Sequence, residues 1–278
     1  MAIFKLHHYL LSIPRFLENS HPRFVVMIHW IVSHHIPTSI RGVLLILCLI
    51  PAVTHADSAP VSARDEVTTA SVIVIGFVGG FVKHDDMVHS AVQVAAHLRQ
   101  NYPSGVYTEV LENHRPGKAY AEITRYLDTD HDGTLSAEEK QNARIILYGH
   151  SWGASEAITL ARELGRQGIP VLLTVQVDSV AKPGENDKVI PPNVAEAANF
   201  YQTNGFVHGE TQIRAADPAR THILGNFRFD YKANPLQCKQ YPWYDRLFMK
   251  SHTEIECDPK VWTQVETLIQ SRLFVQHQ

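Results

Sequence analysis

One ten-residue stretch of the 278-residue sequence limits the fold more than any other, Arg144-Ile-Ile-Leu-Tyr-Gly-His-Ser-Trp-Gly153. Residues 144–148 have the length and apolar character of a buried strand. Residues 149–153 match the pattern G-x-S-x-G, and residues 154–164 carry apolar side chains at helical spacing. The pattern alone could occur by chance in a loop. Between a strand and a helix, however, it predicts a sharp turn with Ser151 exposed at its tip, in an α/β fold.

At these residues the sequence resembles the α/β-hydrolase superfamily, in its small lipase and esterase-like branch, over residues 71–275. The resemblance implies a minimal α/β-hydrolase core, with a mostly parallel sheet and helices on both faces. It also implies that Ser151 is a nucleophile and that the backbone N–H of Trp152 helps to bind an oxyanion. The second oxyanion donor would come from the loop after the first strand, at Gly80 or Phe81. An ordinary glycine turn is the alternative there.

The resemblance further implies an acid and a histidine after Ser151 in the chain. Asp178 ends the expected strand 171–177, directly after the helix that follows Ser151, and is the preferred acid; Asp217 is the alternative. The resembled fold places its histidine in the loop before the last helix, which indicates His252. His222 and His208 remain the alternatives.

Residues 128–139 match the calcium-binding loop of an EF-hand at every diagnostic position. Side-chain oxygens at loop positions 1, 3 and 5, a glycine at 6, a carbonyl at 7, a water-mediated ligand at 9 and a bidentate carboxylate at 12 are the expected arrangement. The corresponding residues are Asp128, Asp130, Asp132, Gly133, Thr134, Ser136 and Glu139. An empty acidic loop is the alternative.

The flanks of this loop differ from those of a full EF-hand. The helix expected to enter it, residues 118–127, is regular, but the exiting helix has only residues 137–143 before the next strand. The sequence contains no second hand with which it could pair. We therefore expect a structural Ca²⁺ site, about 17 Å along the strand from Ser151, and not a calcium switch.

Residues 1–56 differ in composition from the rest of the chain, because they contain seven of the 17 histidines and a single acidic residue. Arg41, an apolar run over residues 42–53 and a small-residue site predict a signal peptide that is cleaved after Ala56. An uncleaved N-terminal anchor is the alternative, and would be the only membrane contact. Residues 57–70 are polar and are expected to be a disordered linker to a domain at 71–278.

Without residues 1–56 the chain retains 21 basic and 27 acidic residues, a formal charge of −6. The sequence has no basic stripe, which argues against a nucleic-acid partner. Cys238 and Cys257 are the only cysteines beyond residue 56, so in an exported protein they predict a disulfide. Two free thiols are the alternative. The bridge would tether residues 239–256, where we expect little regular structure.

Other segments follow simple patterns. Strands are expected at residues 71–77 and 105–111, a helix at 260–274, and a helix or strand at 194–202. Residues 209–215 and 221–229 could form a hairpin around Asp217-Pro218. A helix is expected over 85–101. The nearby cluster of His84, Asp85, Asp86 and His89 is assigned to its cap and first turn in preference to a metal site.

Together these features predict an exported serine hydrolase that acts on carboxylic esters or lipids and carries one structural Ca²⁺ site. A non-catalytic calcium-binding module on the same fold is the alternative from another class. An amidase, peptidase or thioesterase would use the same residues, and the sequence does not separate these reactions.

Overall fold

The computed structural model describes residues 72–273, so the expected leader and the whole of the expected linker lie outside the described residues. The elements are β1 (Val72–Val78), α2 (Ser90–Asn101), β2 (Val106–Glu112), α3 (Pro116–Leu127), α4 (Ala137–Gln141), β3 (Ile145–His150), α5 (Trp152–Arg166), β4 (Val171–Val177), β5 (Val189–Ile190), β6 (Val194–Gln202), β7 (Arg214–Ala215), β8 (His222–Phe229), α6 (Trp243–Phe248), α7 (Lys250–Cys257) and α8 (Pro259–Leu273). Within this range, no helix has the length and apolar character needed to cross a membrane.

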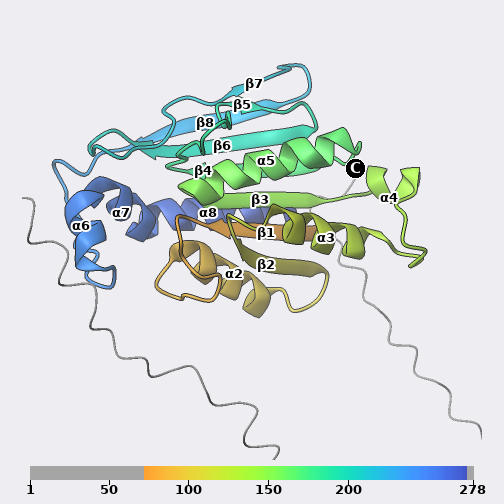
Figure 1. Ribbon diagram of the computed structural model, residues 1–278, viewed down its shortest axis with the longest axis horizontal. Coiled ribbons are helices and arrows are strands. Elements are labelled where there is room, and N and C mark those ends of the chain that lie inside the picture. Colours follow the sequence, from red (N-terminus) through yellow and green to blue (C-terminus); the bar gives the residue numbers. More distant parts are fainter. Residues whose placement is uncertain (1–71, 274–278) are drawn as a thin grey trace, which may run out of the picture. The chain divides into compact units, whose positions relative to one another are not determined.

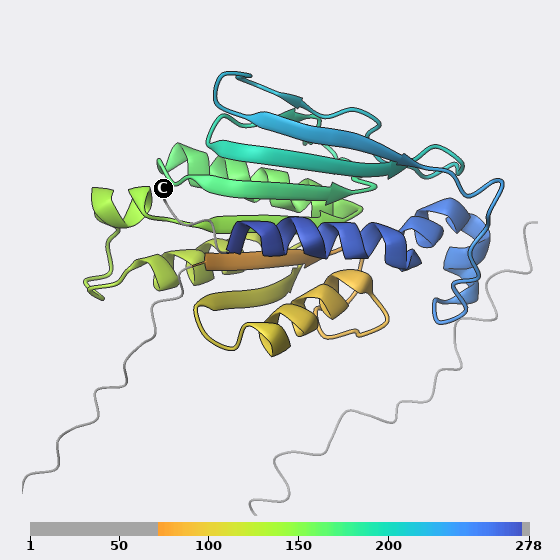
Figure 2. The same ribbon diagram turned by 180° about the vertical axis from the view of Figure 1, so that it is seen from behind.

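The main sheet contains six strands in the order β2-β1-β3-β4-β6-β8, and all neighbouring pairs are parallel. Figure 1 shows these strands running in one direction, with α5 across the near face; Figure 2 shows α8 across the opposite face. The predicted α/β class, a parallel sheet with helices on both faces, is therefore confirmed.

Alternating side chains of the strands supply two separate apolar layers. Val74 of β1 packs with α2 and α8, whereas its neighbours Ile73 and Ile75 pack with α3 and α5. Both faces are covered, which explains why β1 is a continuous apolar run and lacks the alternation of a half-exposed strand. Gly76 interrupts that run because a Cβ there would lie 2.5 Å from the Tyr148 ring on β3. The Tyr148 hydroxyl donates to the Ala91 carbonyl of α2.

The connections reverse direction at the centre of the sheet. From β1 the chain crosses to β2 on one side, and β3 then pairs with the other side of β1. In such sheets the loops after the two central strands diverge and leave a crevice at their carboxyl ends, where ligands bind. The loop after β1 and the turn carrying Ser151 after β3 both lie at this edge.

Two expected boundaries differ from the structure. The helix expected from residue 85 begins at Ser90, because Asp86 instead forms a turn in which its side chain accepts the Val88 N–H. His84 lies 2.6 Å from the Glu112 carboxylate and takes no part in a helix cap. The short helix expected over 137–143 ends at Gln141.

The ambiguous segment 194–202 is the strand β6, and the hairpin expected around Asp217-Pro218 is wrong. β8 pairs with β6 in parallel, and the short β7 pairs in parallel with β5. The Asp217 side chain accepts the Ala219 N–H, and its carbonyl accepts the N–H groups of Arg220 and Thr221. The intervening segment is thus a turn that leads into a crossover.

The disulfide between Cys238 and Cys257 is present and confirms the sequence prediction. It encloses the helices α6 and α7, so the expectation of little regular structure over 239–256 is wrong. Helix α7 runs directly into α8 through Asp258, whose carboxylate accepts the Lys260 N–H. This segment therefore presents a helix face to the carboxyl edge of the sheet.

Candidate active site

The turn between β3 and α5 holds Ser151 in a strained conformation, with φ 57° and ψ −126°. Few residues other than glycine adopt positive φ. The turn is tight because strand and helix nearly touch. A Cβ at Gly149 would lie 2.5 Å from the Gly153 carbonyl carbon, and one at Gly153 would lie 2.4 Å from the Phe77 oxygen. The two glycines of the motif are therefore sterically required.

Backbone hydrogen bonds fix the serine against the end of β4. The Ser151 N–H donates to the Val177 carbonyl over 3.0 Å, and the Val180 N–H donates to the Ser151 carbonyl over 3.4 Å. Asp178 lies between these two partners. The fold therefore brings the first predicted acid to the serine turn.

Asp178 is fully buried, and its carboxylate is surrounded by donors. Its Oδ2 lies 2.7 Å from His252 Nδ1 and accepts from Gln202 Nε2 over 2.8 Å. Its Oδ1 accepts the Gly209 N–H over 2.8 Å. Burial alone would raise the pKa of Asp178, but the bond to His252 and the neighbouring donors hold that pKa below its usual value. An ionised aspartate thus faces the imidazole of α7.

The alternative residues lie elsewhere. His222 and His208 are exposed, and His208 Nδ1 lies 3.1 Å from the Gly209 carbonyl. Asp217 forms the turn described above. His252 differs from expectation only in its element, because it lies in helix α7 and not in a loop.

The expected oxyanion donors meet at the same edge. Trp152 is the first residue of α5, and N–H groups of a first helical turn have no acceptor within the helix. In the loop after β1, Gly79 makes the close approach, since a Cβ there would lie 3.0 Å from Ser151 Cβ. Nothing crowds Gly80, although its φ of 49° suits glycine. The ring of Phe81 contacts that of Trp152 edge-on at 5.8 Å.

A buried amide orients this loop. Asn113 Nδ2 donates to the carbonyls of Val78 over 3.1 Å and Gly80 over 2.5 Å. In a trans peptide the N–H points opposite to the preceding C=O, so the Phe81 N–H points away from Asn113. The Gly79 carbonyl accepts the Val82 N–H over 3.2 Å, so the peptide that carries the Gly80 N–H is held as well. Both predicted donors in this loop therefore belong to fixed peptides.

Sequence analysis missed several residues of the site. Gln202 and Gly209 hold Asp178, and finding them would have required knowing that β6 lies beside β4. His150 and Glu256 were also missed. His150 is a variable position of the serine motif, and its ring packs on that of His252 at 4.5 Å. Glu256 follows His252 by four residues, a spacing that identifies neighbours only once the segment is known to be helical.

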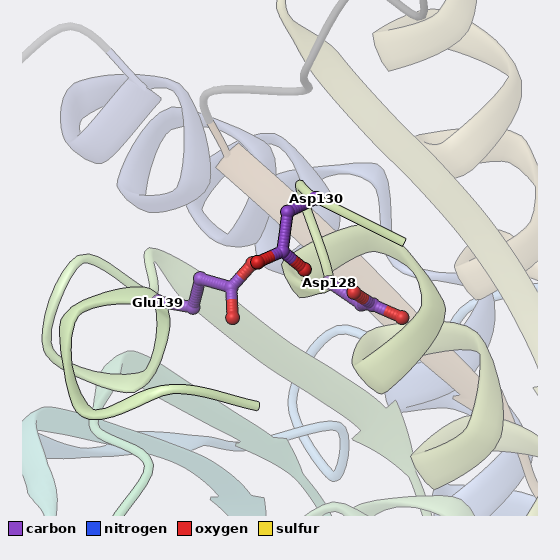
Figure 3. Close-up of side chains that lie close together, drawn as sticks. All are labelled: Asp128, Asp130 and Glu139. Atoms are coloured by element: carbon purple, nitrogen blue, oxygen red, sulfur yellow. The ribbon is translucent and has the colours of Figure 1, made fainter. Parts of the chain in front are cut away.

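The acidic loop lies between α3 and α4, at the opposite edge of the sheet (Figure 1). Figure 3 shows the carboxylates of Asp128, Asp130 and Glu139 in this loop. Oxygens of Asp128, Asp130 and Glu139 lie within 4.8 Å of one another, the one such group of potential metal ligands among residues 72–273. The side chains of His84, Asp85, Asp86 and His89 do not form such a group within these residues. One oxygen of Asp128 is buried without a hydrogen-bond partner in this part of the chain, an arrangement that a cation would satisfy.

The side chains of the other predicted ligand residues form hydrogen bonds within the loop. The Asp132 carboxylate accepts the N–H and hydroxyl of Thr134, and the Ser136 hydroxyl caps α4 by accepting the Glu139 N–H. Gly133 has φ 83°, as the sharp turn at loop position 6 needs. Glu139 has a pKa of about 2, lowered mainly by the Ser136 N–H, and is ionised at neutral pH. The donor set fits a hard cation such as Ca²⁺.

Comparison with protein-family models and with curated proteins finds no match. Among solved structures, the chain is similar to the RedJ thioesterase of the prodiginine pathway in Streptomyces coelicolor (TM-score 0.40, 8% identity, 73% of this chain and 91% of that one). It is also similar to an acetylxylan esterase (TM-score 0.37, 11% identity, 74% and 99%) and to a cutinase-like protein from Cryptococcus sp. (TM-score 0.38, 10% identity, 73% and 94%).

Proposed function

We propose that this chain is a serine hydrolase that cleaves carboxylic esters. The observation that supports it most is the convergence at one sheet edge of a strained, helix-initiating Ser151 and the buried pair of Asp178 and His252. A nucleophile, a base and an orienting acid are the three groups that acyl transfer needs.

In this proposal the Ser151 hydroxyl oxygen attacks the ester carbonyl carbon, while His252 takes the hydroxyl proton. Asp178 holds the Nδ1–H side of the imidazole and stabilises its protonated form. The N–H groups of Trp152 and of Phe81, or alternatively Gly80, bind the negative oxygen. The leaving alcohol receives the proton from His252, and water then releases the acid from Ser151 by the same steps.

Exposed apolar side chains around this edge support an apolar ester or lipid as substrate. Phe81 is 89% exposed and touches the Trp152 ring next to the nucleophile. Phe206 is 99% exposed and lies in the loop between the two residues that hold Asp178. Helix α6 exposes Trp243, Tyr244, Leu247 and Phe248. Such patches on a soluble surface mark binding sites for apolar groups.

Export and a structural Ca²⁺ ion complete the proposal. The disulfide supports an oxidising compartment, as the leader-like composition of residues 1–56 does. For Ca²⁺, the support is the loop geometry with its partnerless Asp128 oxygen. Asp128, Asp130 and Glu139 would hold the ion, which would neutralise their mutual repulsion at the amino end of β3.

Hydrolysis of p-nitrophenyl esters by residues 57–278 tests the function. We expect turnover that falls to background in Ser151→Ala and is unchanged in Ser271→Ala, an exposed serine on α8. A panel of acyl lengths should favour chains longer than acetate, because the surrounding surface is apolar. Equal turnover by the Ser151→Ala chain would exclude the proposed nucleophile.

A further inference from the structure

A second carboxylate, Glu256, is buried behind the candidate active site. Its Oε1 lies 2.5 Å from His89 Nδ1, and its Oε2 lies 3.5 Å from His150 Nδ1. Its backbone carbonyl accepts the Ser90 hydroxyl over 2.7 Å. Burying a carboxylate destabilises the fold unless the group is paired and hydrogen-bonded. The position of Glu256 beside the candidate active site therefore suggests a functional role.

The partners of Glu256 come from the segments that carry the reacting groups. His89 ends the loop after β1, which supplies an oxyanion donor, and His150 is the last residue of β3, directly before Ser151. Glu256 itself lies one helical turn beyond His252 on α7. One side chain therefore joins the oxyanion loop, the nucleophile strand and the helix of the general base.

Glu256 is ionised at neutral pH. Burial alone would raise its pKa, but the neighbouring histidines lower it below its usual value. Burial alone would lower the pKa of His89, but its bond to Glu256 outweighs burial and raises that pKa, which favours the protonated form. Burial lowers the pKa of His150 to about 4, so that imidazole is neutral at pH 7 and lies 3.5 Å from the Glu256 carboxylate.

We infer that Glu256 is a positioning residue for the hydrolytic reaction, which fixes the His252 helix on the Ser151 strand and adds a second buried negative charge that favours the protonated form of His252. The inference rests on the proposed function for its kinetic meaning. His252 would thus lie between two carboxylates, with Asp178 bound to its ring and Glu256 beyond the ring of His150, which is tilted by 35° against that of His252 at 4.5 Å. A nearby buried negative charge stabilises the imidazolium that forms during acyl transfer.

Other charged and titratable groups face Glu256 from each element packed against it. Asp86 Oδ2 lies 3.8 Å from His89 Nε2 on the loop before α2. Tyr241 packs edge-on against the His89 ring at 5.2 Å, and Asp245 faces the cluster from α6. Burial and the charge of Glu256 raise the pKa of Asp245. His89 is the basic side chain bound to Glu256 in this set, so removing each of the two should act on His252 with opposite sign.

The inference predicts two opposite shifts in how His252 titrates. Glu256→Gln removes the negative charge and should move the His252 titration midpoint down by roughly half a pH unit or more. His89→Gln removes the opposing basic group but keeps an N–H donor for Glu256, and should move the midpoint upward. A role in packing alone would move neither midpoint, or both in the same direction.

NMR titration of the His252 imidazole signals in the Ser151→Ala chain makes this measurement without requiring any activity. The matched control is Glu254→Gln on the same helix, where a buried carboxyl group accepts the Leu236 N–H. We expect a shift in Glu256→Gln and none in Glu254→Gln. Equal midpoints in these two variants would overturn the inference. If Glu256→Gln does not fold, an unchanged or lowered midpoint in His89→Gln would overturn it instead.

Kinetics separate this inference from the proposed function. In the chain with Ser151, the acid limb of the kcat/KM profile should shift as the NMR midpoint does. Ser151-dependent hydrolysis with an unshifted acid limb in Glu256→Gln contradicts the inference alone. An NMR shift in a chain with no hydrolytic activity contradicts the proposed function alone.

Discussion

Ser151 and Asp178 are two of the three non-glycine residues with positive φ among residues 72–273, and they lie beside each other at the carboxyl edge of the sheet. Each such conformation costs on the order of 1–3 kcal/mol and persists only where the surrounding structure enforces it. For Ser151 the cause is the contact of Gly153 with the Phe77 backbone. For Asp178 a Cβ on Gly209 would lie 2.2 Å from its carbonyl carbon. The strain is concentrated where we place the chemistry.

Replacement of the buried acid gives the first test at this scale. Asp178→Asn keeps the shape but removes the charge that orients and stabilises the imidazolium, so turnover of p-nitrophenyl esters should fall by roughly three to four decades. Asp217→Asn is the matched control and should leave turnover unchanged, because its side chain closes a surface turn. The opposite pattern would show that the acid is misassigned.

His150 predicts a pH dependence of stability. Its pKa is about 4 in the folded chain, against 6.5 as the reference. Between these values the unfolded chain binds a proton that the folded chain does not, so stability should fall as pH falls from 6.5 to 4, by at most about 3 kcal/mol. His150→Phe should flatten this dependence. Urea unfolding midpoints at pH 7 and pH 4.5 measure this dependence. If the midpoint falls equally in the unmodified chain and in His150→Phe, His150 is not the group responsible.

At the scale of elements, local pattern predicted the central strands well, because a continuous, β-branched apolar run such as Val72–Val78 favours a buried strand. Local pattern gave wrong predictions in segments where polar and apolar residues are interspersed without a clear period. The helix expected from residue 85 begins at Ser90 because the Asp86 turn competes with it. The expected hairpin is a crossover because a local turn at Asp217 does not determine which strand β8 pairs with. Helix α7 was missed because its polar residues, including His252 and Glu256, are buried by contacts from distant segments.

Calcium should stabilise the fold more than it changes turnover. The acidic loop precedes β3, and six strand residues separate it from the serine turn, about 20 Å. Saturating Ca²⁺ should add on the order of 2–3 kcal/mol, and a chelator should lower Tm. The double variant Asp128→Ala, Glu139→Ala should lose this response. A large, reversible effect of Ca²⁺ on turnover at constant Tm would be inconsistent with a structural ion.

Loss of the disulfide should lower esterase activity under conditions in which the core of the domain stays folded. Its 19-residue span encloses α6 and α7 with His252, and a loop of that length constrains the unfolded chain by about 3 kcal/mol. Mild reduction, or Cys238→Ser with Cys257→Ser, should lower esterase turnover while the far-UV circular dichroism of the sheet domain stays unchanged. Full turnover after verified reduction would show that other contacts suffice to hold α7.

At the scale of the whole molecule, the site depends on one topological feature, the reversal between β1 and β3. It brings together the loop after β1, the serine turn, the end of β4 and helix α7, which are far apart in the sequence. From the sequence, Ser151 could be proposed on a local motif, and His252 and Asp178 on chain order. The sequence could not identify Asn113, Gln202 or Glu256, because their roles depend on which strands and helices become neighbours.

The most direct test of the central claim is covalent labelling of the folded chain by a fluorophosphonate probe, with the modified residue located by mass spectrometry. An activated serine reacts with such a probe, whereas ordinary hydroxyl groups do not. We predict a single label on Ser151, absent in Ser151→Ala, strongly slowed in His252→Ala and unchanged in Ser271→Ala. A folded chain that takes no label, or takes it equally without Ser151, would contradict the assignment of this edge as a hydrolytic site.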